Sequence, residues 1–210
     1  MMKIKKMFVV FVIAATLSGC GTGEMINGDG VALNLEEEDR PNLIETNSYS
    51  KEEEIVIDDM IFKNFDVIYT GKSLPEYAPK NEVIYFDEQV DFRGYLMDDF
   101  TYCFITITLE NTTDEEIEEY LSFGLLVDVD EQGKTIARSE EVRYRSDYVP
   151  IDPTGKDYYR CVVEAKSEST FIVGYILQDS MLTSERLYYE INRYGEWFSP
   201  TNFRYIKVDL

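Results

Sequence analysis

Short runs of β-branched and aromatic residues, separated by turn-forming residues, occupy the chain from residue 55 onward. The clearest run covers residues 102–109, where the odd-numbered residues form an apolar face and the opposite face carries Tyr102, Phe104, Thr106 and Thr108. Its apolar face consists of Cys103, Ile105, Ile107 and Leu109. Because successive side chains of a strand point to opposite faces, this alternation predicts a half-buried strand of an antiparallel sheet.

Between residues 55 and 210 ten runs of this kind are candidates, of which we expect about eight or nine to form the strands of the sandwich. Candidate segments are 55–57, 60–69, 83–86, 102–109, 123–129, 135–138, 158–165, 170–177, 187–191 and 203–208. Gly133 lies where a hairpin loop needs a positive φ. Thr113 and Glu116 match a capping box, which predicts one or two helical turns over 113–120. No long amphipathic helix interrupts the strands, so we expect an all-β antiparallel sandwich.

Three segments of this region resemble the immunoglobulin-like domains found in many Gram-positive lipoproteins. They are Ile105–Asp114, Val127–Lys134 and Ser167–Tyr175. The resemblance spans about residues 100–192 and implies an immunoglobulin-like β-sandwich on an extracytoplasmic protein. That family has no established catalytic residues, so the resemblance implies a fold and a location but no site.

The first twenty residues predict a cleaved leader with a lipid attachment point. Three lysines precede an apolar run from Met7 to Leu17, and Leu-Ser-Gly-Cys follows, ending at Cys20. Eleven helical residues are too short for the roughly 30 Å hydrocarbon core, which indicates a signal peptide. The ending resembles the lipobox of bacterial lipoproteins. That resemblance implies cleavage after residue 19, diacylglycerol on Cys20 and anchoring at the extracytoplasmic face of the cell membrane.

Residues 20–54 predict a flexible acidic tether, and 55–210 the folded domain. The tether contains the acid runs Glu36–Asp39 and Glu52–Glu54 and shows no lasting hydrophobic period. The whole chain has a net charge of −21, which becomes −24 once a leader with three lysines and no acids is removed. Such a charge repels phosphate backbones, so the sequence argues against nucleic-acid binding.

The chain contains no histidine. This excludes Ser-His-Asp and Cys-His catalysis and every zinc site that needs an imidazole ligand. No other nucleophile motif stands out, so we expect a non-enzymatic protein without a cofactor other than the lipid on Cys20.

Two cysteines remain in the folded part, Cys103 and Cys161. An extracytoplasmic location permits a disulfide between them. The alternative, which we favour, is a pair of buried thiols that pack as small apolar side chains.

Asp128 and Asp130 are weak candidates for a metal site. With Gln132 and Gly133 they partly match a calcium-binding loop, but Ser139 stands where the loop needs a glutamate. A hairpin with two solvated aspartates explains the pattern better, so we expect no metal.

Tyr194, Trp197 and Phe198 form an aromatic segment, and Gly195 and Pro200 indicate that it is a loop. Exposed aromatic rings stack on sugars or anchor protein partners, and loops on rigid sandwiches are common binding sites. We expect a module that binds an envelope protein through its loops or a sheet edge. The alternative is a module that binds carbohydrate, such as wall glycan, through this aromatic loop.

Overall fold

The computed structural model describes residues 25–26, 32–33, 47–84, 89–91, 95–139, 142–147, 159–193 and 203–210. The chain divides into two compact units, and the boundary lies between Arg40 and Pro41. In the first unit, Met25–Ile26 (β1) pairs antiparallel with Ala32–Leu33 (β2). The second unit contains the β-sheets of the folded domain.

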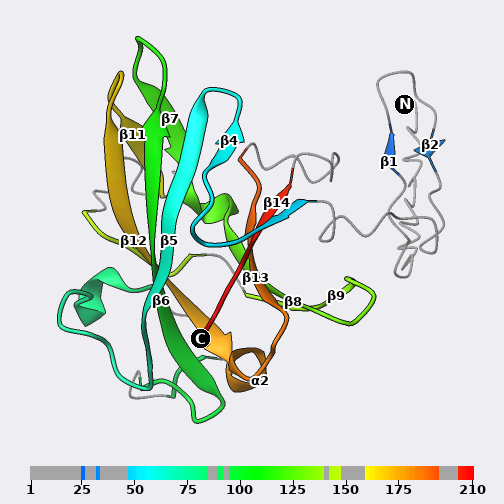
Figure 1. The fold of residues 1–210 in the computed structure, drawn as a ribbon. Helices are drawn as coiled ribbons and strands as arrows, with labels where there is room; N and C mark the ends of the chain where they lie inside the picture. The colour runs from blue at the N-terminus through cyan, green and yellow to red at the C-terminus, as the bar shows by residue number, and fades with distance from the viewer. Residues whose placement is uncertain are drawn as a thin grey trace, which may run out of the picture. The chain divides into compact units, whose positions relative to one another are not determined.

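The described strands of the second unit form two five-stranded sheets and one small sheet (Figure 1). The first sheet has the order β10-β12-β6-β5-β4: Tyr144–Arg145, Glu168–Gln178, Phe100–Asn111, Met60–Gly71 and Ile55–Ile57. The second has the order β3-β14-β13-β8-β9: Ser48–Tyr49, Arg204–Lys207, Leu187–Ile191, Leu125–Val129 and Thr135–Arg138. The small sheet pairs β11 (Arg160–Val163) with β7 (Ile117–Tyr120).

Helical structure in the described residues is short. It comprises η2 (Lys80–Glu82), η3 (Leu121–Phe123) and α2 (Asp179–Leu182). The predicted all-β sandwich is therefore confirmed. Its pairing is antiparallel except between β3 and β14, which run parallel over two residue pairs.

The main core lies where the two five-stranded sheets face each other. It contains inward residues of both sheets, among them the predicted face of β6. Phe65 of β5 contacts Tyr189 of β13 with ring centroids 5.0 Å apart. Tyr175 of β12 donates its hydroxyl to the Gly124 carbonyl at 2.9 Å. A Cβ on Gly124 would stand 1.9 Å from the Tyr189 hydroxyl, so only glycine fits this close approach.

A β-bulge in β5 changes which residues face the core. The register with β6 shifts between Lys63 and Asp66, and Asn64 adopts a φ of 53°. The extra residue turns Phe65 inward, on the opposite parity from Phe62. A strict two-residue alternation therefore cannot hold along the whole of β5.

The outer face of β6 is more buried than its sequence predicts. Tyr102, Phe104 and Thr108 are buried, although we expected a solvated face. Ala78 and Val83 belong to the same buried cluster as Tyr102 and Phe104, because the connection before β6 folds across this face. The half-buried prediction is thus wrong for these side chains.

The helical turns predicted over 113–120 are also wrong. Ile117–Tyr120 forms strand β7 and pairs with β11. Thr113 serves a turn instead, since both its backbone amide and its hydroxyl donate to the Asn111 side-chain oxygen at 2.8 Å. Asparagine and threonine side chains compete with helix formation by making such local bonds.

Other local predictions agree with the structure. β8 and β9 form the predicted hairpin, and Gly133 has a φ of 76°. Leu187–Ile191 is a strand with the predicted bounds.

The short strand expected over 83–86 does not form at Val83 and Ile84, the two residues of this range that the structure describes.

Strand β3 lies inside the range for which we expected a tether. Ser48 and Tyr49 pair with Tyr205 and Ile206 of β14, so this sheet includes residues before position 55.

Among the described residues, no helix has the length and apolar character needed to cross a membrane.

Candidate functional site

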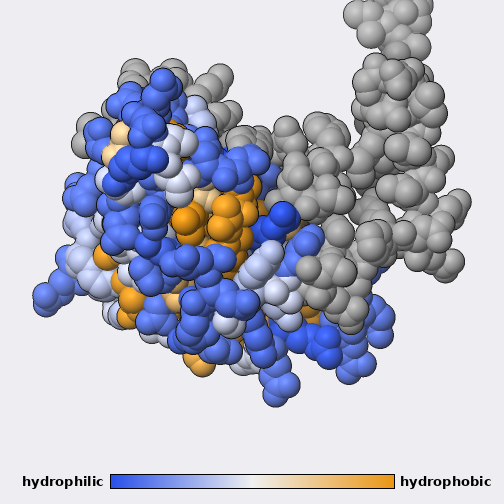
Figure 2. Space-filling model, turned by 45° about the horizontal axis from the view of Figure 1, so that its top comes forward, coloured by the Kyte–Doolittle hydropathy of each residue, from blue (hydrophilic) through white to orange (hydrophobic). Residues whose placement is uncertain are grey.

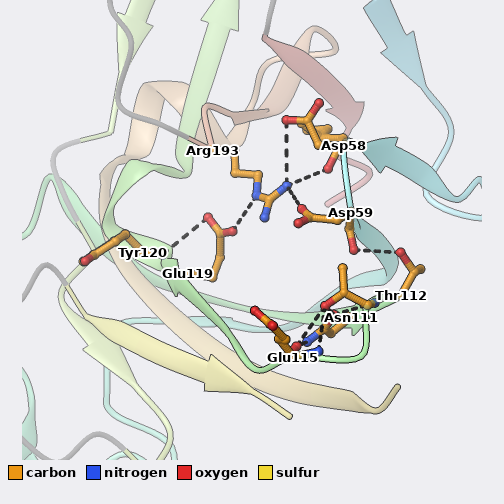
Figure 3. A network of polar contacts seen from close by, with 10 residues as sticks. Asp58, Asp59, Asn111, Thr112, Glu115, Glu119, Tyr120 and Arg193 are labelled. Carbon is orange, nitrogen blue, oxygen red and sulfur yellow. Dashed lines mark hydrogen bonds and ion pairs between the residues drawn. The ribbon is translucent and has the colours of Figure 1, made fainter. Parts of the chain in front are cut away.

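A buried arginine joins three parts of the fold (Figure 3). Arg193 follows β13 by two residues, and its side chain is 6% exposed. Its Nε donates to Glu119 of β7 at 2.9 Å, and its Nη1 donates to the Ile57 carbonyl at 2.7 Å. The same Nη1 lies 2.6 Å from an oxygen of Asp59, in the β4–β5 turn. One guanidinium therefore links the second sheet, the small sheet and the first sheet.

Burial sets the electrostatics of this network. The Glu119 side chain is only 4% exposed, and this burial raises the pKa of its carboxyl. The Arg193 charge and hydrogen bond act in the opposite direction. A buried guanidinium and carboxylate at hydrogen-bonding distance stabilise each other only while both are present. The network thus holds the Arg193 guanidinium between the three sheets.

A second feature is a set of exposed apolar side chains on the connection between β5 and β6. We call these the aromatic patch: Tyr77, Ile84, Tyr95 and Met97. Tyr95 is the most exposed of them at 66%, and each of the others exceeds 40%. Lys80 lies over the Tyr95 ring at 5.5 Å from its centroid, which brings the two arms of the connection together. Figure 2 shows one face of the molecule, mostly hydrophilic with small islands of hydrophobic residues.

The aromatic patch rests on a rigid base. Phe104 of β6 contacts Tyr77 edge-on with ring centroids 5.7 Å apart, and it also contacts Tyr144 of β10. The Tyr144 hydroxyl donates to the Tyr77 carbonyl at 2.8 Å. Phe104 itself fits because its neighbour on β12 is Gly174, where a Cβ would stand 2.6 Å from the Phe104 ring. Tyr77 is therefore held against a packed layer of the first sheet.

An ion pair and its hydrogen bonds join the two ends of the connection between β5 and β6. Lys72 donates to Asp179 at 2.6 Å and to the carbonyls of Asp98 and Phe100 at 2.7 and 2.8 Å. The Lys72 hydrogen bond, followed by that of Thr101, lowers the pKa of Asp179. These contacts hold the first and last residues of the connection side by side, at the start of α2.

Two open hollows meet at the edge of the second sheet. They share Tyr188 and Lys207, which are cross-strand neighbours, and Asp209. Lys51 and Arg186 add positive charge to the walls, and Glu52 and Glu185 add negative charge. Because charges of both signs line the hollows, they favour neither an anionic nor a cationic ligand.

Both cysteines are free, buried thiols. Burial raises the pKa of Cys103 and that of Cys161 to about 12 each. At neutral pH both remain protonated, and a protonated thiol is a poor nucleophile and a poor metal ligand. They contribute to the main core instead.

Of the two aspartates of the partial calcium motif, Asp130 stabilises the hairpin turn, whereas the expectation that both are solvated is wrong for Asp128. Asp130 accepts hydrogen bonds from the backbone amides of Gln132 and Lys134 at 2.9 and 2.8 Å. Asp128 is buried and accepts a hydrogen bond from the Ser184 hydroxyl. Among the described residues, no three metal-binding side chains gather into one group.

The remaining predicted site residues lie outside the described residues. They are Cys20, Tyr194, Trp197 and Phe198. Their predicted roles therefore stay predictions. The structure contributes the position of Arg193, next to the aromatic loop segment in the sequence.

Sequence reasoning missed Arg193 and the aromatic patch. An isolated arginine after a strand carries no local sign that it will be buried. The patch residues stand among glycine, proline and aspartate, which predict a connection but not which of its apolar side chains are exposed.

No protein-family model matches the chain, and no curated protein matches it. Solved structures resemble it at low similarity, among them the following two. The YjhA protein from Bacillus subtilis is 11% identical, with a TM-score of 0.42, over 77% of this chain and 99% of that one. An uncharacterised β-sandwich protein from Clostridium difficile 630 is 13% identical, with a TM-score of 0.40, over 77% of this chain and 93% of that one.

Proposed function

We propose that the chain is a lipid-anchored lipoprotein of the cell envelope whose β-sandwich binds another envelope protein without catalysing a reaction. In this proposal a diacylglycerol on Cys20 holds the protein at the extracytoplasmic face of the membrane. The leader sequence and the Leu-Ser-Gly-Cys ending support the anchor. The three segments that resemble immunoglobulin-like lipoprotein domains support the same location.

The aromatic patch is the observation that favours a binding role. Interface cores are enriched in tyrosine, methionine and other large apolar side chains. Here two tyrosines, an isoleucine and a methionine are exposed on one connection that is packed onto the first sheet. A rigid base reduces the conformational entropy lost when a partner binds.

The thiols and the composition argue against catalysis. The chain has no histidine, and its two buried cysteines have raised pKa values of about 12. Neither feature supplies an activated nucleophile at neutral pH.

The test is recovery of the anchored protein from living cells. The full chain with a C-terminal tag is cross-linked at the cell surface, purified, and its attached proteins are identified. The expected result is one stoichiometric envelope protein that is lost in Cys20→Ala. Recovery of the same background proteins from both forms would contradict the proposal.

Carbohydrate binding through Tyr194, Trp197 and Phe198 is the second candidate. It is supported by the three aromatic side chains themselves, since such rings stack on sugar faces. We expect Trp197→Ala to abolish retention on wall glycan without lowering the melting temperature. Unchanged retention would remove this candidate.

A further inference from the structure

We draw no further inference here: the strongest candidate, the apolar cluster of Leu125, Val127, Val129, Phe203 and Tyr205 on the outer face of the second sheet, carries none because nothing in the described part of the chain shows what covers this face.

Discussion

Glu119 and Glu190 are both buried glutamates on strands, yet their surroundings differ. Burial raises the pKa of each. Glu119 accepts from Arg193 at 2.9 Å, and both side chains are almost fully buried. Glu190 has Arg138 at 3.2 Å and a hydrogen bond with Tyr205, but the Arg138 side chain is 38% exposed, and Glu190 Oε1 has no hydrogen-bond partner among the described residues.

The difference lies in how fully each carboxylate is compensated. A buried charge is tolerated when its partner is equally buried and its oxygens are bonded. Glu119 meets this condition and connects three parts of the fold. Glu190 meets this condition only in part. We therefore expect the Glu190 carboxylate to lower the stability of the fold, whereas the Glu119–Arg193 pair maintains that stability.

The largest effect is expected from Arg193→Met. The variant leaves Glu119 buried without its cation, which typically destabilises a protein by about 3–5 kcal/mol. Urea unfolding followed by circular dichroism measures the change.

A paired replacement sharpens this prediction. Arg193→Met combined with Glu119→Leu removes both charges, so much of the lost stability should return. If the double variant is as unstable as Arg193→Met alone, the buried charge is not the cause of the loss.

Glu190→Met is expected to change stability in the opposite direction. It removes a buried carboxylate with an unbonded oxygen and keeps a side chain of similar length, but it also removes the acceptor of the Tyr205 hydroxyl and the partner of Arg138. An unsatisfied buried polar group usually costs about 1–3 kcal/mol and a hydrogen bond contributes about 1 kcal/mol, so we expect a small net gain. A clear loss in the same urea assay would show that the Arg138–Glu190 pair stabilises the sheet.

The advantage of Glu190→Met should depend on pH. The folded protein holds the Glu190 proton more tightly than the unfolded chain, because burial raises this pKa from 4.5. The wild type therefore loses stability relative to the variant as pH rises from about 4.5 through the folded-state pKa. Unfolding at a series of pH values checks the sign, and a difference that shrinks with rising pH would refute it.

The smallest effect is expected from Lys72→Met. The Lys72–Asp179 pair has side chains 53% and 44% exposed, and surface ion pairs usually contribute less than about 1 kcal/mol. The lysine lowers the Asp179 pKa below 3.8, so its contribution exists above that pH and disappears as pH falls further. A loss comparable to that of Arg193→Met would mean that exposure does not separate these ion pairs.

Local pattern predicted the strands and the hairpin well. Alternation located β6, and Gly133 located the β8–β9 turn, because both signals depend on neighbouring residues. Local pattern did not predict β7. The capping signal favoured helical turns, whereas the segment pairs with β11, forty residues away in the sequence. Local pattern also failed at Phe65, since the bulge that turns this residue inward depends on pairing between β5 and β6.

The candidate sites were predicted only at the level of residue types. Asp130 was identified with a hairpin from the sequence, and its bonds to Gln132 and Lys134 explain why, whereas the burial of Asp128 against Ser184 was not predicted. Arg193 could not be selected, because its burial follows from the meeting of three sheets. The exposure of Tyr95 likewise depends on how the connection folds over β6.

The sequence by itself determined the all-β class, the acidic surface charge and the positions of most strands, since these follow from composition and from a period of two residues. Tertiary structure alone decided which outer faces are covered, which glutamate has a buried partner, and which aromatic side chains are exposed. Those properties arise from contacts between residues far apart in the chain. Their free energies depend on burial and on partner geometry, which no local pattern records.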